Sequence, residues 1–184
     1  MGRKKQDLEI RIKNILKSSE EVNGNNAAII AQSYEEIKNN YKSHEAIEDD
    51  KLYKQLIDVC KDENWKGIST SLDYKEKDIH KMFLSILTFY VKPKNETEYS
   101  KEIEELVESD INGIYSKQAF ALYLNTIFLK DKEKNLKKIK TFVEKYKNKF
   151  SKSDLELLLK SSKLYNVDVT EEGISLNYKA IKKK

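Results

Sequence analysis

The sequence has one cysteine, one proline and five glycines among its 184 residues, and it contains no long apolar run. The single cysteine, Cys60, excludes a disulfide within the chain, and its place on an apolar helical face predicts a buried thiol. No apolar segment approaches the roughly 18 residues that a membrane-spanning helix requires. The basic N-terminus is not followed by the apolar stretch of a signal peptide. These absences predict a soluble protein of the reducing cytoplasm.

Residues that carry chemistry are also few. His44 and His80 are the two histidines, and neither has cysteines or carboxylates at the spacing of metal ligands. We expect His44 to be exposed and His80 to flank the core. No motif joins a serine, threonine or tyrosine to a general base, and no glycine-rich phosphate loop is present. The acidic residues at 48–50 and at Asp58 and Asp62 are typical of solvated helix ends. The sequence therefore predicts a protein that is not an enzyme and uses no cofactor or metal.

The scarcity of proline and glycine favours long helices, and apolar residues recur at intervals of three and four almost throughout. We predict an all-α protein of six to eight helices, built as a multi-helix bundle or as stacked antiparallel helical hairpins. Residues 1–184 are expected to form a single helical domain. Its N-terminal helix is basic and covers residues 1–20. Further helices are expected over residues 25–41, 49–60, 77–91, 98–109, 117–129, 133–150 and 155–165, with a short helix at 62–72 interrupted near Gly67.

Particular residues are expected to begin and end these helices. Asp73, with Glu76 three residues later, has the pattern of an N-cap with a capping box. Pro93 disfavours helix at the residue before it and should end the preceding helix. Gly113 should break the next helix, and Ser116 should cap the one that follows.

The most apolar helices are expected to supply one core. The residues that we expect there are Phe83, Ile86, Leu87, Phe120, Leu124, Phe142 and Val143. Phe83 and Phe120 lie 37 residues apart, and Ile103 and Val107 lie 36 residues before Ile139 and Val143. Such an interval is typical of repeated helical hairpins, although only two copies are seen.

The C-terminal segment departs from the helical pattern. Apolar residues alternate at Val167 and Val169 and again at Ile174, Leu176 and Tyr178. Thr-Glu-Glu-Gly lies between the two runs, so residues 167–184 are predicted to be an appendage of a short β-hairpin followed by a basic tail. A helix capped by Thr170 is the alternative, but the glycine in its first turn argues against it.

Charge is unevenly distributed along the chain. The net charge is only +4, yet residues 130–152 hold ten lysines against three acidic residues, and residues 95–110 hold seven acidic residues against one lysine. Lysine outnumbers arginine 33 to 2, which an AT-rich genome would explain without any function. Arginine is the residue that reads guanine through two hydrogen bonds, so a protein with so little of it should contact backbone phosphate rather than bases.

A helical wheel aligns four lysines of residues 133–150. The apolar residues fall within an arc of about 120°, and Lys134, Lys138, Lys145 and Lys149 fall within about 60° beside it. Lys137 projects to another side. At 1.5 Å per residue this predicts a lysine ridge about 22 Å long. The ridge is either a solvated face that keeps the protein soluble or a docking strip for phosphates or an acidic partner.

These patterns predict a non-enzymatic protein that binds DNA or RNA through backbone phosphates with little sequence preference. The expected contacts are Lys134, Lys138, Lys145, Lys149, Lys152, Arg3, Lys4 and Lys5. In size, charge and helical build the chain is similar to the helical small subunits of CRISPR effector complexes, and equally to many phage and plasmid accessory proteins, without a matching motif. That similarity implies a place in a larger nucleoprotein complex. The alternative is an adaptor or inhibitor that docks proteins, or copies of itself, through opposed charged faces, the acidic face being Glu102, Glu104, Glu105 and Glu108.

Overall fold

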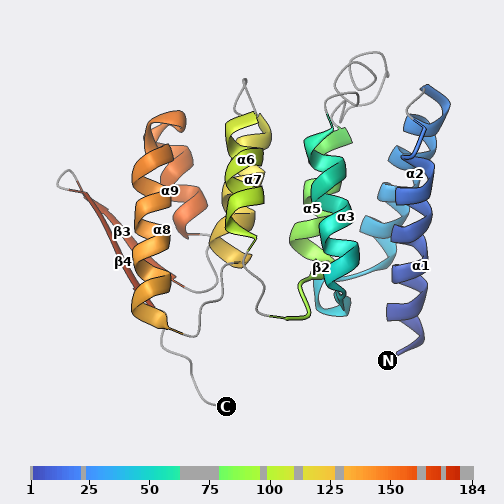
Figure 1. Cartoon of the computed structure of the whole chain (residues 1–184), viewed down its shortest axis with the longest axis horizontal. Coiled ribbons are helices and arrows are strands. Elements are labelled where there is room, and N and C mark those ends of the chain that lie inside the picture. The colour runs from blue at the N-terminus through green and yellow to red at the C-terminus, as the bar shows by residue number, and fades with distance from the viewer. Residues whose placement is uncertain are drawn as a thin grey trace. The chain divides into compact units, whose positions relative to one another are not determined.

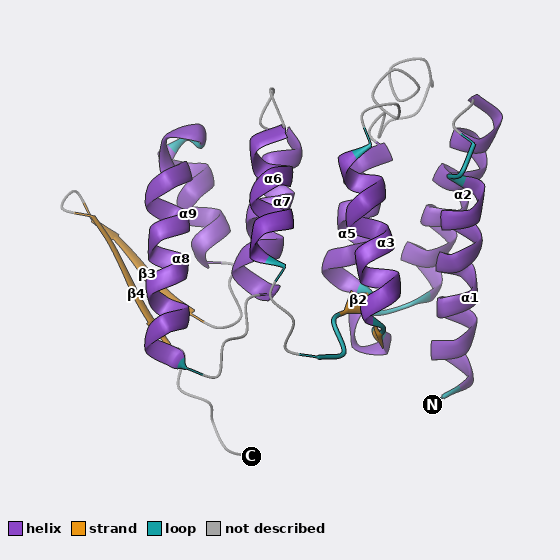
Figure 2. Ribbon diagram, viewed as in Figure 1, coloured by secondary structure: helices purple, strands orange, loops and turns teal. Residues whose placement is uncertain are grey.

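The structure is a computed structural model in which helices dominate, so the predicted all-α class is confirmed (Figures 1 and 2). It describes residues 2–21, 24–62, 79–95, 99–109, 114–126, 131–160, 165–170 and 173–178. The chain divides into two compact units, Met1–Asn95 and Glu96–Lys184. The single domain stays a prediction, since this division does not show whether the units fold independently. In the described ranges, no helix has both the length and the apolar content needed to cross a bilayer.

The first unit is built from two pairs of helices. Helix α1 packs on α2, and α3 packs on α5 (Figure 1). Helices α2 and α3 correspond to the predicted helices at 25–41 and 49–60. The elements are α1 (Arg3–Ser18), α2 (Gly24–Asn40), the 3₁₀ turn η1 (Ser43–Glu45), β1 (Ile47–Glu48), α3 (Asp50–Lys61), α5 (Ile79–Phe89) and β2 (Val91–Lys92).

A parallel pair of very short strands was not predicted. Strands β1 and β2 pair Ile47 with Val91. The amide of Ile47 donates to the carbonyl of Tyr90 at 2.8 Å, just after α5 ends at Phe89. The helix therefore ends two residues earlier than predicted, because residues 91–92 pair with a strand more than forty positions away. Sequence periodicity carries no information about such a distant partner.

The second unit combines four helices with a β-hairpin. Helix α6 packs on α7, α7 packs on α9, and the hairpin contacts α8 and α9. Its strands are antiparallel, with Val167 opposite Leu176 and Thr170 opposite Gly173, which confirms the predicted hairpin. The elements are α6 (Ser100–Ser109), α7 (Ile114–Thr126), α8 (Lys132–Tyr146), the 3₁₀ turn η2 (Lys147–Lys149), α9 (Lys152–Lys160), β3 (Tyr165–Thr170) and β4 (Gly173–Tyr178).

All seven predicted core residues are buried, each with at most 1% of its surface exposed. Phe83, Ile86 and Leu87 belong to the first unit, and the other four belong to the second. The rings of Phe142 on α8 and Tyr123 on α7 stack with centroids 3.6 Å apart. An aromatic cluster thus joins these two helices. The 36–37-residue repeat stays a prediction.

Other helix boundaries also differ from those predicted, and α9 covers Lys152–Lys160 rather than 155–165. Helix α7 begins at Ile114, so Ser116 lies inside its first turn and is not the N-cap. Its fully buried hydroxyl instead donates to the carbonyl of Val107 on α6 at 2.9 Å. Helix α8 ends at Tyr146, and Lys149 lies on the 3₁₀ turn that follows. The predicted short helix after residue 62, the cap at Asp73 with Glu76 and the break at Gly113 lie outside the described residues.

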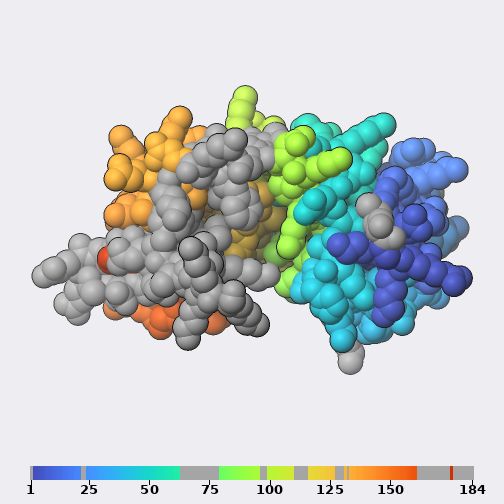
Figure 3. Space-filling view, turned by 90° about the horizontal axis from the view of Figure 1, so that it is seen from below, coloured from blue at the N-terminus to red at the C-terminus, as the bar shows by residue number. Residues whose placement is uncertain are grey.

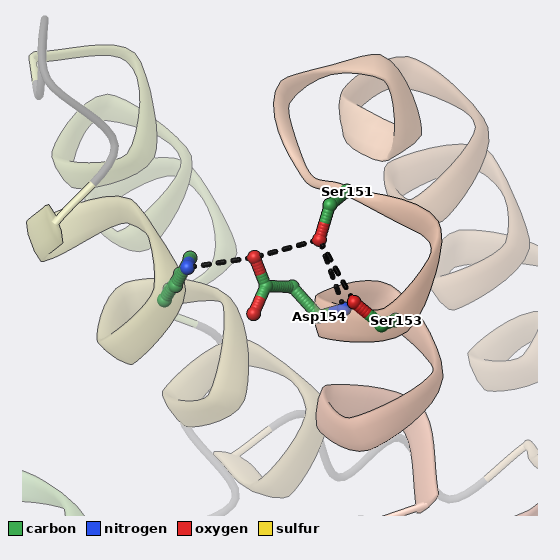
Figure 4. A network of polar contacts seen from close by, with 4 residues as sticks. Ser151, Ser153 and Asp154 are labelled. Atoms are coloured by element: carbon green, nitrogen blue, oxygen red, sulfur yellow. Dashed lines mark hydrogen bonds and ion pairs between the residues drawn. The ribbon is translucent and has the colours of Figure 1, made fainter.

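Helix α9 begins with a polar network that ties it to α7 (Figure 4). Ser151 accepts from the Asp154 amide at 3.2 Å, and its hydroxyl donates to Asp154 Oδ2 at 2.8 Å. The same oxygen accepts from Nζ of Lys117 on α7 at 2.8 Å. The hydrogen bond from Lys117 and then that from Ser151 lower the pKa of Asp154. The carboxylate form of Asp154 is therefore stabilised by the fold.

Asp154→Asn is expected to lower the thermal unfolding midpoint at pH 7 and to leave it nearly unchanged near pH 2. A carboxylate whose pKa falls on folding contributes stability above its unfolded pKa of about 3.9, and the contribution disappears as the pH falls through the folded pKa. Circular dichroism melts at both pH values measure the difference. Asp58→Asn, in an ion pair within the single helix α3, is the control and should change the midpoint less. An Asp154→Asn effect of equal size at both pH values would contradict this account.

Candidate nucleic-acid interface

Four lysines line a groove in the second unit. The groove has a volume of about 540 Å³ and lies between α6, α7 and α8. Lys134, Lys137, Lys138 and Lys145 come from α8, Glu104 from α6 and Tyr123 from α7. We call these six residues and the space between them the lysine groove. Four positive charges face one carboxylate, so the groove attracts anions.

The N-terminus and the buried face of α8 hold the lysines in position. Asp131 caps the helix, accepting from the amides of Glu133 at 3.0 Å and Lys134 at 3.1 Å. On the inner side, Ile139, Phe142 and Val143 are each at most 1% exposed. This burial confirms the helical phase from which the ridge was predicted, up to the end of α8. Lys134 is exposed and Lys138 is half-buried, so both lie beside the buried face of α8.

The aromatic residues next to the lysines are buried. Tyr123, Phe142, Tyr146 and Phe150 are between 1% and 8% exposed. Burial raises the pKa of Tyr123, so its phenol stays neutral at physiological pH. Stacking on bases requires an accessible ring face, which these four residues do not offer. The lysine groove therefore contributes charge rather than a stacking platform.

Lys145 is bound to the acidic helix α6. Its Nζ lies 2.8 Å from Oε1 of Glu108 and 3.9 Å from Oε2 of Glu104. The hydroxyl of Tyr146 also donates to Glu108 Oε1, at 2.7 Å. The hydrogen bond from Lys145 and then that from Tyr146 lower the pKa of Glu108, and the same contacts raise the pKa of Lys145. The acidic and basic segments of the sequence thus meet within the second unit.

Lys149 also contacts α6, as well as the ring of Tyr146. Its Nζ donates to the carbonyl of Val107 at 3.2 Å and lies 5.5 Å from the ring centroid of Tyr146. The predicted ridge of four aligned lysines is thus divided. Lys134, Lys138 and Lys145 line the groove, and Lys145 and Lys149 contact α6.

The other four predicted phosphate contacts belong to helices other than α8. Arg3, Lys4 and Lys5 open α1 in the first unit, whose dark blue atoms are seen at the surface in Figure 3. Lys4 is 74% exposed, and its Nζ lies 3.4 Å from a carboxylate oxygen of Glu45. Lys152 is exposed at the first position of α9. None of these four residues lines the lysine groove.

The four acidic residues of the alternative function all lie on α6. Glu102 and Glu104 are half-buried, whereas Glu105 and Glu108 are exposed. Glu104 and Glu108 are the two that approach Lys145. Part of the acidic face is therefore already paired with the chain's own lysine.

The described residues hold no cluster of metal ligands. In these ranges, no three histidine, cysteine or carboxylate side chains come together as metal ligands. His44 is exposed, as predicted, whereas His80, which was expected to flank the core, is buried. Cys60 is buried, and burial raises the pKa of its thiol, which disfavours the reactive thiolate.

Sequence reasoning missed Lys137 as part of the site. On an ideal wheel it projects about 60° from Lys134, which is why it was placed on another side. In the structure both residues line the same groove, because α6 and α7 form the opposite wall and widen the region that a long lysine side chain reaches. A wheel of one helix does not include the partner helices that shape a groove.

Comparisons with protein-family models, with curated proteins and with solved structures give no match for this chain. The function is accordingly inferred from the charges and contacts of the second unit.

Proposed function

We propose that the protein binds nucleic acid by placing backbone phosphates along the lysine groove, with little preference for sequence. The observation that supports this proposal most directly is that Lys134, Lys137 and Lys138 of α8 all line the lysine groove. In the described part of the chain, Lys134 and Lys137 form no ion pair. Their charges are therefore available to an anionic ligand.

The dimensions suit a polymer of phosphates better than a single anion. Lys134 and Lys145 are eleven residues apart, which is about 16 Å along a helix. Duplex DNA presents one negative charge per about 1.7 Å of its axis, so several phosphates lie within this span. Lysine contacts phosphate as a point charge and reads no base edge, which explains the expected lack of sequence preference. Arg3, Lys4, Lys5 and Lys152 are proposed as additional phosphate contacts.

The contacts of α6 make docking through opposed charged faces the weaker proposal. Glu104 and Glu108 neutralise Lys145 inside one unit, so neither face offers its full charge to a protein partner or to another copy. Lys134 and Lys137, which form no ion pair in the described ranges, keep an excess of positive charge at the groove. That excess favours a polyanion.

Titration of a labelled duplex of about 20 base pairs, followed by fluorescence anisotropy over a salt series, tests the proposal. Each lysine that neutralises a phosphate releases a counterion, so the three groove contacts alone give a log–log salt slope of about −2.7 on duplex DNA, and each additional contact steepens it by about 0.9. Two unrelated duplexes of equal length should bind with the same affinity within about two-fold, because phosphate contacts carry no sequence information. Absence of binding to DNA and RNA at low salt would refute the proposed function.

A further inference from the structure

Lys145 is the lysine of the groove that lies beside two carboxylates of α6. The hydrogen-bonded carboxylate of Glu108 lies on one side of its ammonium group, and Glu104 lies beside it. Both side chains of the Lys145–Glu108 pair are 51% exposed. The pair is therefore open to solvent, and to any anion that approaches along the groove.

We propose that Glu108, supported by Glu104, occupies at Lys145 the position that a backbone phosphate would take, so that α6 acts as an internal competitor of nucleic acid. This inference rests on the proposed function. A carboxylate oxygen 2.8 Å from Nζ satisfies the ammonium in the same way as a phosphate oxygen. A phosphate that reaches Lys145 must displace this oxygen or lie close to a second negative charge.

The contacts of Glu108 indicate that it competes with phosphate for Lys145 but that nucleic acid can displace it. Exposed ion pairs contribute little to stability, since water solvates the separated charges almost as well. Tyr146 donates to the same carboxylate oxygen at 2.7 Å and so holds Glu108 in place when Lys145 leaves it. A polymer already held at Lys134, Lys137 and Lys138 brings further phosphates at high effective concentration. An isolated anion has no such help, so these two glutamates make the groove selective for polyanions.

Glu108→Gln is the sharpest test, because the amide keeps an acceptor oxygen for Tyr146 and Lys145 and removes only the charge. Removing the competing charge should raise the affinity for duplex DNA at low salt about five-fold. A fourth phosphate contact at Lys145 should also steepen the salt slope by about 0.9. Inorganic phosphate should compete with the duplex more effectively on the variant than on the wild-type protein.

Glu156→Gln is the matched control, since it removes one carboxylate from α9 of the same unit, where Glu156 lies 4.0 Å from Lys160. It should change affinity less than two-fold. Wild-type binding with an unchanged or weakened Glu108→Gln variant would overturn the competitor and leave the proposed function intact. Failure of the wild-type protein and of both variants to bind would overturn the proposed function, and the competitor with it. A thermal melt of each variant verifies that the fold is retained.

Discussion

Replacing Lys134, Lys137 and Lys138 together by glutamate is expected to abolish binding to duplex DNA and RNA. The change turns three attractive charges at the lysine groove into three repulsive ones, beside Glu104 that is already there. Because phosphate neutralisation supplies essentially all of the affinity of sequence-independent binding, the proposed contacts outside the groove should not restore it against this repulsion. Anisotropy titrations at low salt measure the effect, which should exceed about a hundred-fold by loss of three such contacts.

The matched control reverses three other exposed lysines, Lys38, Lys54 and Lys160, each in a contact within its own helix. Its net charge equals that of the groove variant, so a general effect of charge would weaken both proteins alike. We expect the control to lose much less affinity. Both triple variants should keep nearly full stability, because surface substitutions seldom change it by more than about 0.5 kcal/mol each. Equal loss of binding in the two variants would place the interface elsewhere.

Phe142→Ala is expected to destabilise the protein by about 3–5 kcal/mol, as large-to-small changes of buried aromatic residues do. Phe142 is 1% exposed, and its ring is stacked on that of Tyr123. The rings of Phe120 and Tyr146 lie 5.1 Å and 4.7 Å from it. Alanine would leave a cavity bounded by three aromatic rings that cannot all close over it. Urea unfolding followed by circular dichroism measures the change in the free energy of unfolding.

Leu157→Ala serves as the control for this substitution. Leu157 on α9 is 70% exposed, so its truncation removes little buried surface and should cost less than about 0.5 kcal/mol. A loss below about 1 kcal/mol for Phe142→Ala would mean that the aromatic cluster does not hold α8 against α7. The orientation of the lysines on α8 would then have no structural basis.

The helices and their buried faces could be predicted from sequence because the apolar periodicity of an isolated helix survives in the fold. Phe142 and Val143 are buried as the wheel of residues 133–150 requires, and Lys134 and Lys138 lie on the expected side. The C-terminal hairpin was likewise predictable, since alternation and a four-residue turn signal are both local.

Contacts between distant segments were not predictable in the same way. Strand β2 ends α5 early through pairing with residues 47–48, and Ser116 hydrogen-bonds α6 rather than capping its own helix. Lys145 belongs to the predicted ridge by angle, yet it pairs with Glu108, 37 residues earlier in the chain. Such pairings depend on which helices become neighbours, and neither charge counts nor a helical wheel contain that information.

The salt dependence of Lys134→Gln is the most direct test of phosphate binding at the lysine groove. Lys134 lines the groove and forms no ion pair in the described ranges, so its neutralisation removes one charge without releasing a partner. If Lys134 contacts a phosphate, the log–log salt slope on duplex DNA should become shallower than the wild-type slope by about 0.9. A slope identical to that of the wild-type protein would contradict the account.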